Sequence, residues 1–324
     1  MFVLDGSVKI GAYVFKTIHE VSYVKSVNEI VDTAVLKLPT SFKIRQNGEL
    51  KYTEEAIKIG DKVAITIGYE NKYRATEFVG YVRKIKPTIP LEIHCEDEMW
   101  LLRRKTITKA WNTNTNLKEV LTEIVKGTTI KVAENIPDIP LDNYIIRNAN
   151  GTQVLQHLKK NLRLTAFIND RNELYCGLAQ FTNINDEVIY DLNYNLIENN
   201  LEFKSKEERK IRVRYTYINS KGVKKEVEFG DTGGELRCYR TSVVSDVTVL
   251  EKLAQTEIEK LKYNGFEGTV KTFLIPYATR GMKATLLDQE HLNREGSYFI
   301  KKVVTYFGTD GANRVVTIGK RLNG

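Results

Sequence analysis

The stretch Gly60-Asp61-Lys62-Val63-Ala64-Ile65-Thr66-Ile67-Gly68-Tyr69 indicates the dominant structural pattern of the chain. A turn leads into a segment in which Val63, Ile65 and Ile67 share one face, the period-two pattern of a half-buried β-strand. Similar segments flank it at residues 8–14, 18–24, 32–39, 76–85 and 91–95. About six short strands in roughly 100 residues predict a small antiparallel barrel or sandwich.

The middle of the chain changes to helical periodicity. Four apolar residues recur on one helical face, namely Leu117, Val120, Leu121 and Ile124. Asn116 precedes them and is suited to cap the helix. A second helix is expected over about 152–161, and a hairpin over 164–177. Two helices and a hairpin predict a small α/β unit.

Strands return after about residue 195. They are expected at residues 202–204, 211–218, 223–229, 268–275, 284–287, 298–307 and 314–319. One helix interrupts them, with Asp246 as its cap and Asn264-Gly265 at its end.

Two stretches share the same order of elements, which indicates an internal repeat. The first runs from Gly60-Asp61-Lys62 through a strand at Gly80 to the strand 91–95. The second runs from Gly281-Met282-Lys283 through a strand at Gly296 to the strand 314–319. A duplication predicts two similar β-domains with a different domain between them.

The predicted fold is therefore mainly β with an α+β insert. Two similar small β-barrels, at residues 1–106 and 196–324, flank an α/β middle domain at 107–195. The second barrel is expected to carry an inserted helix near residues 246–264. We expect the barrels to superpose on one another as separate sheets.

Composition excludes several classes of protein. The 324 residues are 42% hydrophobic and 28% charged, which is ordinary for a folded domain and argues against disorder. No apolar run approaches the ~20 residues of a membrane helix, and the first residues have no basic, apolar leader. We therefore expect neither a signal peptide nor a membrane anchor.

The net charge of +8 raises the question of nucleic-acid binding. The 49 basic residues are interspersed with 41 acidic ones. Even the densest basic stretch, Lys204 to Arg214, contains Glu207 and Glu208. This distribution favours solvated faces or subunit contacts over a DNA-binding surface.

No catalytic, cofactor or metal motif is recognisable. The four histidines are scattered without metal-ligand spacing, at His19, His94, His157 and His291. Asp231-Thr232-Gly233 resembles the aspartic-protease triplet but occurs once, whereas that chemistry needs two carboxylates. The acidic run Glu96-Asp97-Glu98 is better explained as a strand exit than as a glycosidase pair, whose carboxyl groups face each other across a bond. We predict a non-enzymatic protein without cofactors.

Cysteine and aromatic residues are more consistent with packing than with a binding site. Cys95, Cys176 and Cys238 lie far apart, as expected for buried reduced thiols. A sugar-binding platform would need exposed aromatic rings, for which the sequence offers Trp100, Trp111, Tyr69, Tyr73 and Tyr81. Core and interface packing explains them better.

Arginines mark one candidate contact face. Arg212 and Arg214 alternate with apolar residues, so they share the polar side of their strand. Together with Arg83 they form the candidate lumen or subunit-interface residues of the sequence.

Several segments together resemble the phage tail baseplate hub family, which includes late control gene D proteins, Mu-like tail hubs and the hub part of the type VI spike protein VgrG. They are Leu36-Lys37-Leu38-Pro39, Gly60-Asp61-Lys62, Phe78-Val79-Gly80-Tyr81-Val82, Ile93 to Leu102, the helix and hairpin at 152–177, and the helix-led C-terminal β-domain. The resemblance covers nearly the whole chain and lies in the order and pattern of elements.

This resemblance implies a structural role in the virion. It implies two tube-type barrels per chain and a homotrimer whose six barrels form a pseudo-sixfold ring between tail tube and spike. Partners would be the tail tube and spike proteins, with transient lumen contact to DNA or the tape-measure protein, after assembly in the host cytoplasm. A nucleic-acid-binding or a carbohydrate-binding β-barrel protein remains the alternative.

Overall fold

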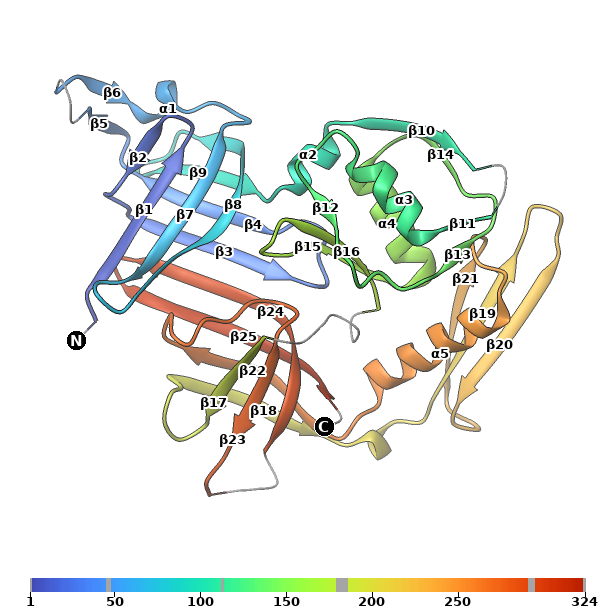
Figure 1. Ribbon diagram of the computed structural model, residues 1–324. Helices are drawn as coiled ribbons and strands as arrows, with labels where there is room; N and C mark the ends of the chain where they lie inside the picture. The colour runs from blue at the N-terminus through green and yellow to red at the C-terminus, as the bar shows by residue number, and fades with distance from the viewer. Residues whose placement is uncertain (1, 45–47, 112–113, 179–185, 291–294, 323–324) are drawn as a thin grey trace.

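The computed structural model describes residues 2–44, 48–111, 114–178, 186–290 and 295–322. The chain is mostly β and divides into two β units, a middle unit and an arm, which Figure 1 shows side by side. Thirteen strands of the two β units belong to one sheet. None of the helices in the described ranges combines the length and the apolarity needed to span a bilayer.

The first β unit occupies the N-terminal end of the chain. Its strands are β1 (Leu4–Ile10), β2 (Tyr13–Phe15), β3 (Glu20–Ser26), β4 (Thr33–Leu38), β7 (Lys62–Tyr69), β8 (Tyr73–Lys86) and β9 (Leu91–Glu96). A small hairpin, β5 (Ser41–Lys43) and β6 (Leu50–Tyr52), and the single turn α1 (Thr53–Ala56) stand at its end. Val63, Ile65 and Ile67 are fully buried in its core, which confirms the period-two pattern.

The second β unit is made by the C-terminal part of the chain. Its strands are β17 (Glu187–Asp191), β18 (Glu198–Lys204), β22 (Gly265–Thr272), β23 (Lys283–Leu287), β24 (Gly296–Gly308) and β25 (Gly311–Leu322). Residues such as Val270, Val303 and Val316 fill a separate core.

The middle unit lies beside the first β unit. Its helices are α2 (Met99–Arg103), α3 (Leu117–Val125) and α4 (Gly151–Leu162). Its strands are β10 (Thr106–Ala110), β11 (Thr115–Asn116), β12 (Lys131–Val132), β13 (Pro140–Leu141), β14 (Ile145–Asn150), β15 (Thr165–Ile168) and β16 (Glu173–Gly177). Asn116 caps α3 through the Glu119 amide, as predicted, and Asn150 forms a capping box with Gln153 at α4.

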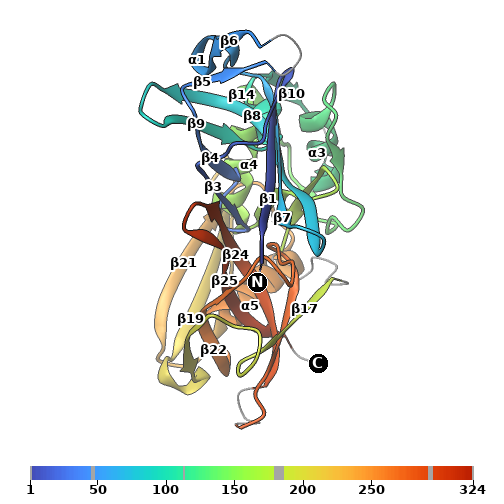
Figure 2. The ribbon, with the colours of Figure 1, turned by 90° about the vertical axis from the view of Figure 1, so that its left-hand side faces the viewer.

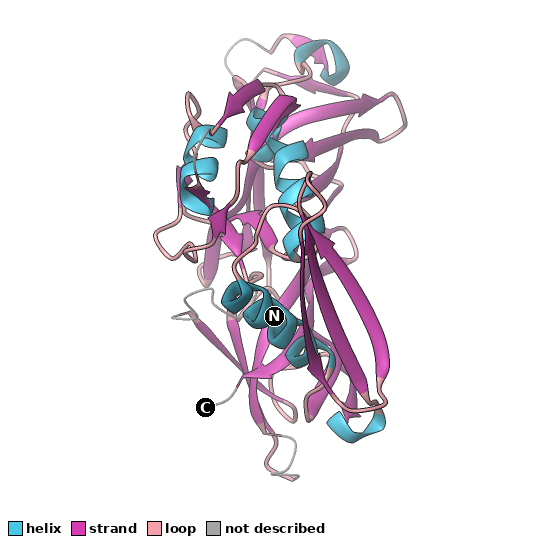
Figure 3. Cartoon of the chain, turned by 90° about the vertical axis from the view of Figure 1, so that its right-hand side faces the viewer, coloured by secondary structure: helices cyan, strands magenta, loops and turns pink. Residues whose placement is uncertain are grey.

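The arm is the part that differs most from the sequence prediction. It consists of the short turn η2 (Lys206–Glu208), the sheet β20 (Lys224–Gly230), β19 (Ile211–Ile218) and β21 (Glu235–Thr241), and the helix α5 (Val247–Leu261). Figure 3 shows its three long strands and its helix from the side that they occupy, and Figure 1 places them away from the first β unit. Asp246 caps α5, as predicted.

The domain boundaries therefore differ from those expected. Strands β19 and β20 were expected in the second barrel, but the buried face of β19 joins the core of the middle unit through Val213 and Tyr215. Conversely β17, expected in the middle domain, pairs with β23 of the second β unit. Alternation predicts a buried face but not the partner that covers it.

The two β units repeat one strand order. In chain order β1, β3, β4, β7, β8 and β9 correspond to β17, β18, β22, β23, β24 and β25. In space the first set runs β3-β4-β9-β8-β7-β1 and the second β18-β22-β25-β24-β23-β17. One pairing differs in direction, because β1 is antiparallel to β7 whereas β17 is parallel to β23.

Matching turns fix the register of the repeat. The Gly60 amide donates to Val82 O at 2.8 Å, and the Gly281 amide donates to Ile300 O at 2.9 Å. Both glycines have positive φ, 91° and 84°. The sheet register shifts directly after Val82 and again after Ile300. Val82 thus corresponds to Ile300, and Gly80 to Tyr298 rather than to the Gly296 matched from sequence.

Replacing either turn glycine should weaken the fold. Gly60→Ala and Gly281→Ala should each lower the free energy of unfolding by about 1–2 kcal/mol, because an L-residue is strained at positive φ. Urea unfolding measures this loss. Asn tolerates this conformation better, so the matched Asn variants should lose less. Equal stability of the Ala variants and the parent would contradict the turn geometry.

Candidate functional site: the joint between the two β units

The feature that organises the molecule is the edge joint, the antiparallel pairing of β3 with the second half of β24. It runs from Ser26 opposite Lys302 to Glu20 opposite Gly308. The first half of β24 pairs instead with β23 of the second β unit. The single long strand β24 therefore pairs with strands of both β units. Figure 2 shows the two units stacked end to end across this joint. The expected separate sheets are thus one continuous sheet.

A buried ion pair lies under the edge joint. Arg314 of β25 and Glu77 of β8 are each about 1% exposed, and the Arg314 Nη1 to Glu77 Oε2 distance is 2.6 Å. Arg314 also donates to Leu274 O at 2.9 Å. The hydroxyls of Tyr23 and Tyr73 donate to the Glu77 carboxylate. Charge and hydrogen-bonding capacity are therefore largely matched in this buried network.

The pKa values follow from this burial. Burial and the neighbouring Glu77 carboxylate raise the pKa of the Tyr23 and Tyr73 hydroxyls, so both stay protonated donors. Burial alone would lower the pKa of Arg314, but hydrogen bonds to Glu77 raise it above its usual value. Arg314 is therefore charged at any ordinary pH.

A second cluster ties all three units together through Arg280. Its Nη2 lies 2.6 Å from Asp32 of the first β unit and also donates to Ile168 O of the middle unit. Asp170 of the middle unit binds Lys25 at 2.7 Å and lies 3.6 Å from Arg280 Nη1. Arg280 itself precedes β23 of the second β unit.

The pKa values of Asp170, Asp32 and the neighbouring Asp97 are shifted in opposite directions. Burial opposes ionisation of Asp170, but Lys25 and Arg280 lower its pKa to about 2. Burial raises the pKa of Asp32, despite the nearby Arg280. Burial and the neighbouring Asp32 also raise the pKa of Asp97.

The arginines predicted as contact residues fall in two separate places. Arg83 lies on β8, is half-exposed and pairs with Glu96 at 2.8 Å. Arg212 and Arg214 share the outer face of the arm, where both pair with Glu228. The structure therefore brings Arg212 and Arg214 together and leaves Arg83 on another unit.

The acidic residues 96–98 form ion pairs and hydrogen bonds with nearby side chains and backbone groups. Glu96 accepts from Arg83 and Arg103, and the Asp97 carboxylate accepts the Met99 amide at 3.1 Å. Glu98 lies 3.3 Å from Lys62. These contacts hold the exit from β9 and the start of α2.

The other sequence candidates occupy structural positions. Asp231 accepts from Lys262 and from the Ile211 amide in the turn after β20. Tyr69 and Trp100 are buried, and Trp111 packs near Tyr144, so the five aromatics do not share one exposed platform.

Cysteines and histidines add no metal centre within the described ranges, where no three His, Cys, Asp or Glu side chains gather to hold an ion. His291 lies outside those ranges. Cys95 and Cys176 are free and buried, as expected. Cys238 is exposed on the outer face of the arm, which corrects the expectation that all three are buried.

Sequence reasoning missed Glu77, Arg314, Arg280 and Asp32. A usable signal exists for the first two: each is a charged residue at the start of a predicted strand, with opposite sign in the two β units. Nothing in the local pattern links Arg280 to Asp32, because 248 positions separate them along the chain.

Comparison with known proteins tests the resemblance found in the sequence. No protein-family profile matches the chain, and no curated protein matches it. Several solved structures, however, match its fold. A tail protein of Neisseria meningitidis MC58 matches with a TM-score of 0.69 at 12% identity, over 98% of this chain and 97% of that one. The chain has the fold of phage tail proteins.

Two further structures agree with this fold. The 43 kDa tail protein of prophage MuSo2 from Shewanella oneidensis has a TM-score of 0.64 at 17% identity, covering 98% of each chain. The E. coli c3393 protein, a type VI secretion component described as similar to T4 tail proteins gp27 and gp5, has a TM-score of 0.62 at 8% identity. It covers 98% of this chain and 77% of that one. The predicted resemblance to tail hub proteins is confirmed at the level of fold.

Breaking the buried ion pair should be costly. Arg314→Met leaves the Glu77 carboxylate buried without its cation, so the free energy of unfolding should fall by about 3–5 kcal/mol. The double variant with Glu77→Gln should lose less than the two single variants combined. Both are measured by urea unfolding.

The matched control is the exposed ion pair Arg74–Asp5, whose side chains are 49% and 41% exposed. Arg74→Met should cost under about 1 kcal/mol. A similar loss of unfolding free energy for Arg74→Met and Arg314→Met would show that burial of the Glu77–Arg314 pair does not determine its contribution to stability.

The pH dependence of stability should separate the two kinds of carboxylate. Asp170, with its pKa lowered to about 2, stabilises the fold above its unfolded pKa of about 3.9 and loses that contribution as pH falls towards 2. Asp170→Asn should thus be less stable at pH 7, and the difference should shrink in acid. Asp97→Asn should show the opposite sign, a gain at pH 7 that fades in acid. Differences independent of pH would refute this assignment.

Proposed function

We propose that this protein is a structural, non-enzymatic hub subunit of a phage tail baseplate or a related injection machine. Three copies close into a ring of six β units that joins the tail tube to the spike. The observation that carries the proposal is the edge joint, since it links two β units of the same strand order within one chain.

Each chain presents a second, unused copy of both halves of the edge joint. The counterpart of β3 is β18, which pairs with β22 along one edge and with no other strand of the described ranges. The counterpart of β24 is β8, and its residues beyond Val82 pair only with β9. The free edge of β18 in one chain therefore fits the free edge of β8 in the next. Pairing them also removes two exposed edges that would otherwise favour aggregation.

The repeat also gives the register of this contact. Ile85 corresponds to Val303, and the ladder pairings lead from Ile85 to Val21 of β3 and from Val303 to Asn199 of β18. Four residues further along these strands, Lys25 therefore corresponds to Phe203. Because Val303 lies opposite Lys25 within the chain, Ile85 of one chain lies opposite Phe203 of the next. Lys86 then lies opposite Glu202, a pair of opposite charges. Phe203, which is 56% exposed in the single chain, becomes covered by the neighbouring strand. Pro87 offers no amide to the ladder, so this contact is shorter than the internal one.

Such a ring presents two symmetries. Alternation of first and second β units gives six similar units, whereas the middle unit and the arm occur once per chain and so three times per ring. Six similar units suit a tail tube built from rings of six, and three protruding modules suit a threefold spike.

The remaining assignments follow from this placement. Arg83 borders the proposed contact on β8, and Arg212 and Arg214 lie on the outer face of the arm, so all three belong to subunit or partner interfaces. The lumen would meet DNA or the tape-measure protein transiently. The assembled protein belongs to the virion, after assembly in the host cytoplasm.

A designed disulfide tests the contact between chains. In a Cys238→Ser background, Lys86→Cys combined with Glu202→Cys should give disulfide-linked trimers on mild oxidation at high protein concentration. Non-reducing gel electrophoresis and mass measurement detect them.

The control shifts one partner by two residues along β18, combining Lys86→Cys with Asn200→Cys. It should cross-link far less, because the register places these positions too far apart. Equal cross-linking of both pairs, or a product limited to dimers, would contradict the proposed ring.

A further inference from the structure

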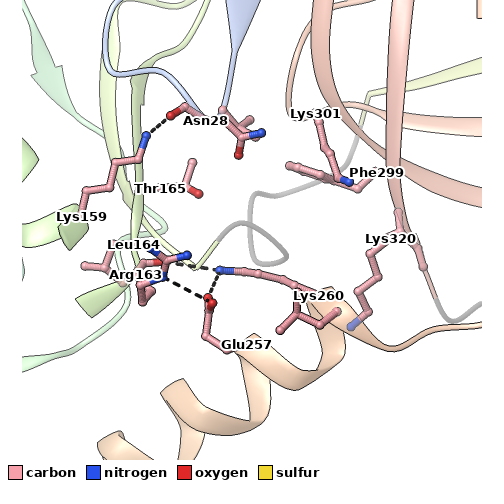
Figure 4. Close-up of a pocket in the computed structure, with 13 residues that line it drawn as sticks. Asn28, Lys159, Arg163, Leu164, Thr165, Glu257, Lys260, Phe299, Lys301 and Lys320 are labelled. Carbon is pink, nitrogen blue, oxygen red and sulfur yellow. Dashed lines mark hydrogen bonds and ion pairs between the residues drawn. The ribbon is translucent and has the colours of Figure 1, made fainter. Parts of the chain in front are cut away.

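A basic cavity of about 290 Å³ lies where the middle unit, the arm and the second β unit meet. Figure 4 shows it between the end of α4, the end of α5 and the strands β24 and β25. Its cations come from the middle unit, the arm and the second β unit: Lys159, Arg163, Lys260, Lys301 and Lys320.

Most of this positive charge is already balanced. Glu257 accepts from Arg163 and from Lys260, at 3.4 and 2.7 Å. Outside the cavity wall, Glu267 lies 3.3 Å from Lys301, and Glu259 lies 2.7 Å from Lys320. Lys204 shares Glu267 with Lys301, and the charge of Glu29 acts on Lys159, so six cations face four carboxylates. The ends of α4 and α5 add roughly half a negative charge each, which leaves about one positive charge.

Lys159 is the cation of this set that makes no ion pair, although the charge of Glu29 acts on it. It is half-buried, and its ammonium donates to Asn28 O, with no carboxylate within ion-pair distance among the residues the structure describes. Desolvation lowers its pKa. A half-buried ammonium that makes no ion pair is stabilised by an anion entering beside it.

The rest of the wall is apolar. Phe299 and Leu164 are buried at one side, and Leu261 and Leu322 contribute half-buried side chains. We propose that the cavity binds one carboxylate carried on a short apolar stem, the chemistry of a polypeptide chain end or of an acidic side chain. Its carboxylate lies against Lys159 and Arg163, and its stem packs on Phe299.

Size and charge both favour such a ligand over a phosphate. The cavity lies at the small end of ligand sites, so it suits a side chain or a chain end rather than a nucleotide. One surplus positive charge matches a monoanion, whereas a phosphate dianion would be left under-neutralised next to Glu257.

Isothermal titration calorimetry on the full chain tests this inference. N-acetyl-L-leucine offers a chain-terminal carboxylate and N-acetyl-L-glutamic acid α-amide a side-chain carboxylate, so their relative affinities identify the source. At least one should bind saturably, whereas neutral N-acetyl-L-leucinamide should not, and inorganic phosphate should bind more weakly. Lys159→Met should weaken carboxylate binding about tenfold or more, because it removes a charge-assisted hydrogen bond.

The exposed Lys58 provides the matched control, since Lys58→Met changes net charge equally without touching the cavity. Without ligand, Lys159→Met should unfold at the same urea concentration as the parent. If it does not fold, Arg163→Met takes its place with the same expected loss of binding, because Arg163 is the other cation against the carboxylate. Binding of the amide, tighter binding of phosphate, no carboxylate binding, or an equal effect of Lys58→Met would each overturn the proposal.

Discussion

The pairing of β3 with β24 is the contact on which the remaining architecture depends. It makes one sheet from two β units, and the buried pair Glu77–Arg314 holds the cores together beneath that sheet. An ion pair with almost no solvent contact stabilises only when its remaining hydrogen bonds are met, and Tyr23, Tyr73 and the Leu274 carbonyl meet them. A rigid connection between units follows from this satisfied network.

Arg280 extends the same rigidity to the middle unit. Its guanidinium contacts Asp32, Asp170 and the Ile168 carbonyl, groups from two units that are distant in sequence. The arm in turn packs on the core of the middle unit through β19 and α5. Each chain is therefore a set of modules fixed by buried polar contacts at their junctions.

Sequence patterns predicted the elements better than their assembly. Alternation at Val63, Ile65 and Ile67 and the caps Asn116 and Asp246 are local signals, and the structure confirms them. Strand β19 shows the limit, because its buried face could cover either a barrel or the middle unit. The pairing of β3 with β24 could not be predicted from local sequence. Strand edges pair through backbone N–H and C=O groups, which every strand has, so the sequence does not show which two edges pair. The sequence predicted Arg83, Arg212 and Arg214 as contact residues. It did not predict that Arg83 lies on a different unit from Arg212 and Arg214.

The central claim is that the internal joint is repeated between chains, so that three copies form six β units around one axis. Electron microscopy of the protein at high concentration, or together with tail tube and spike proteins, tests this most directly. The account predicts a closed ring with six similar β densities and three protruding modules formed by the middle unit and the arm. A dimer, or an assembly without a ring of six densities, would contradict it.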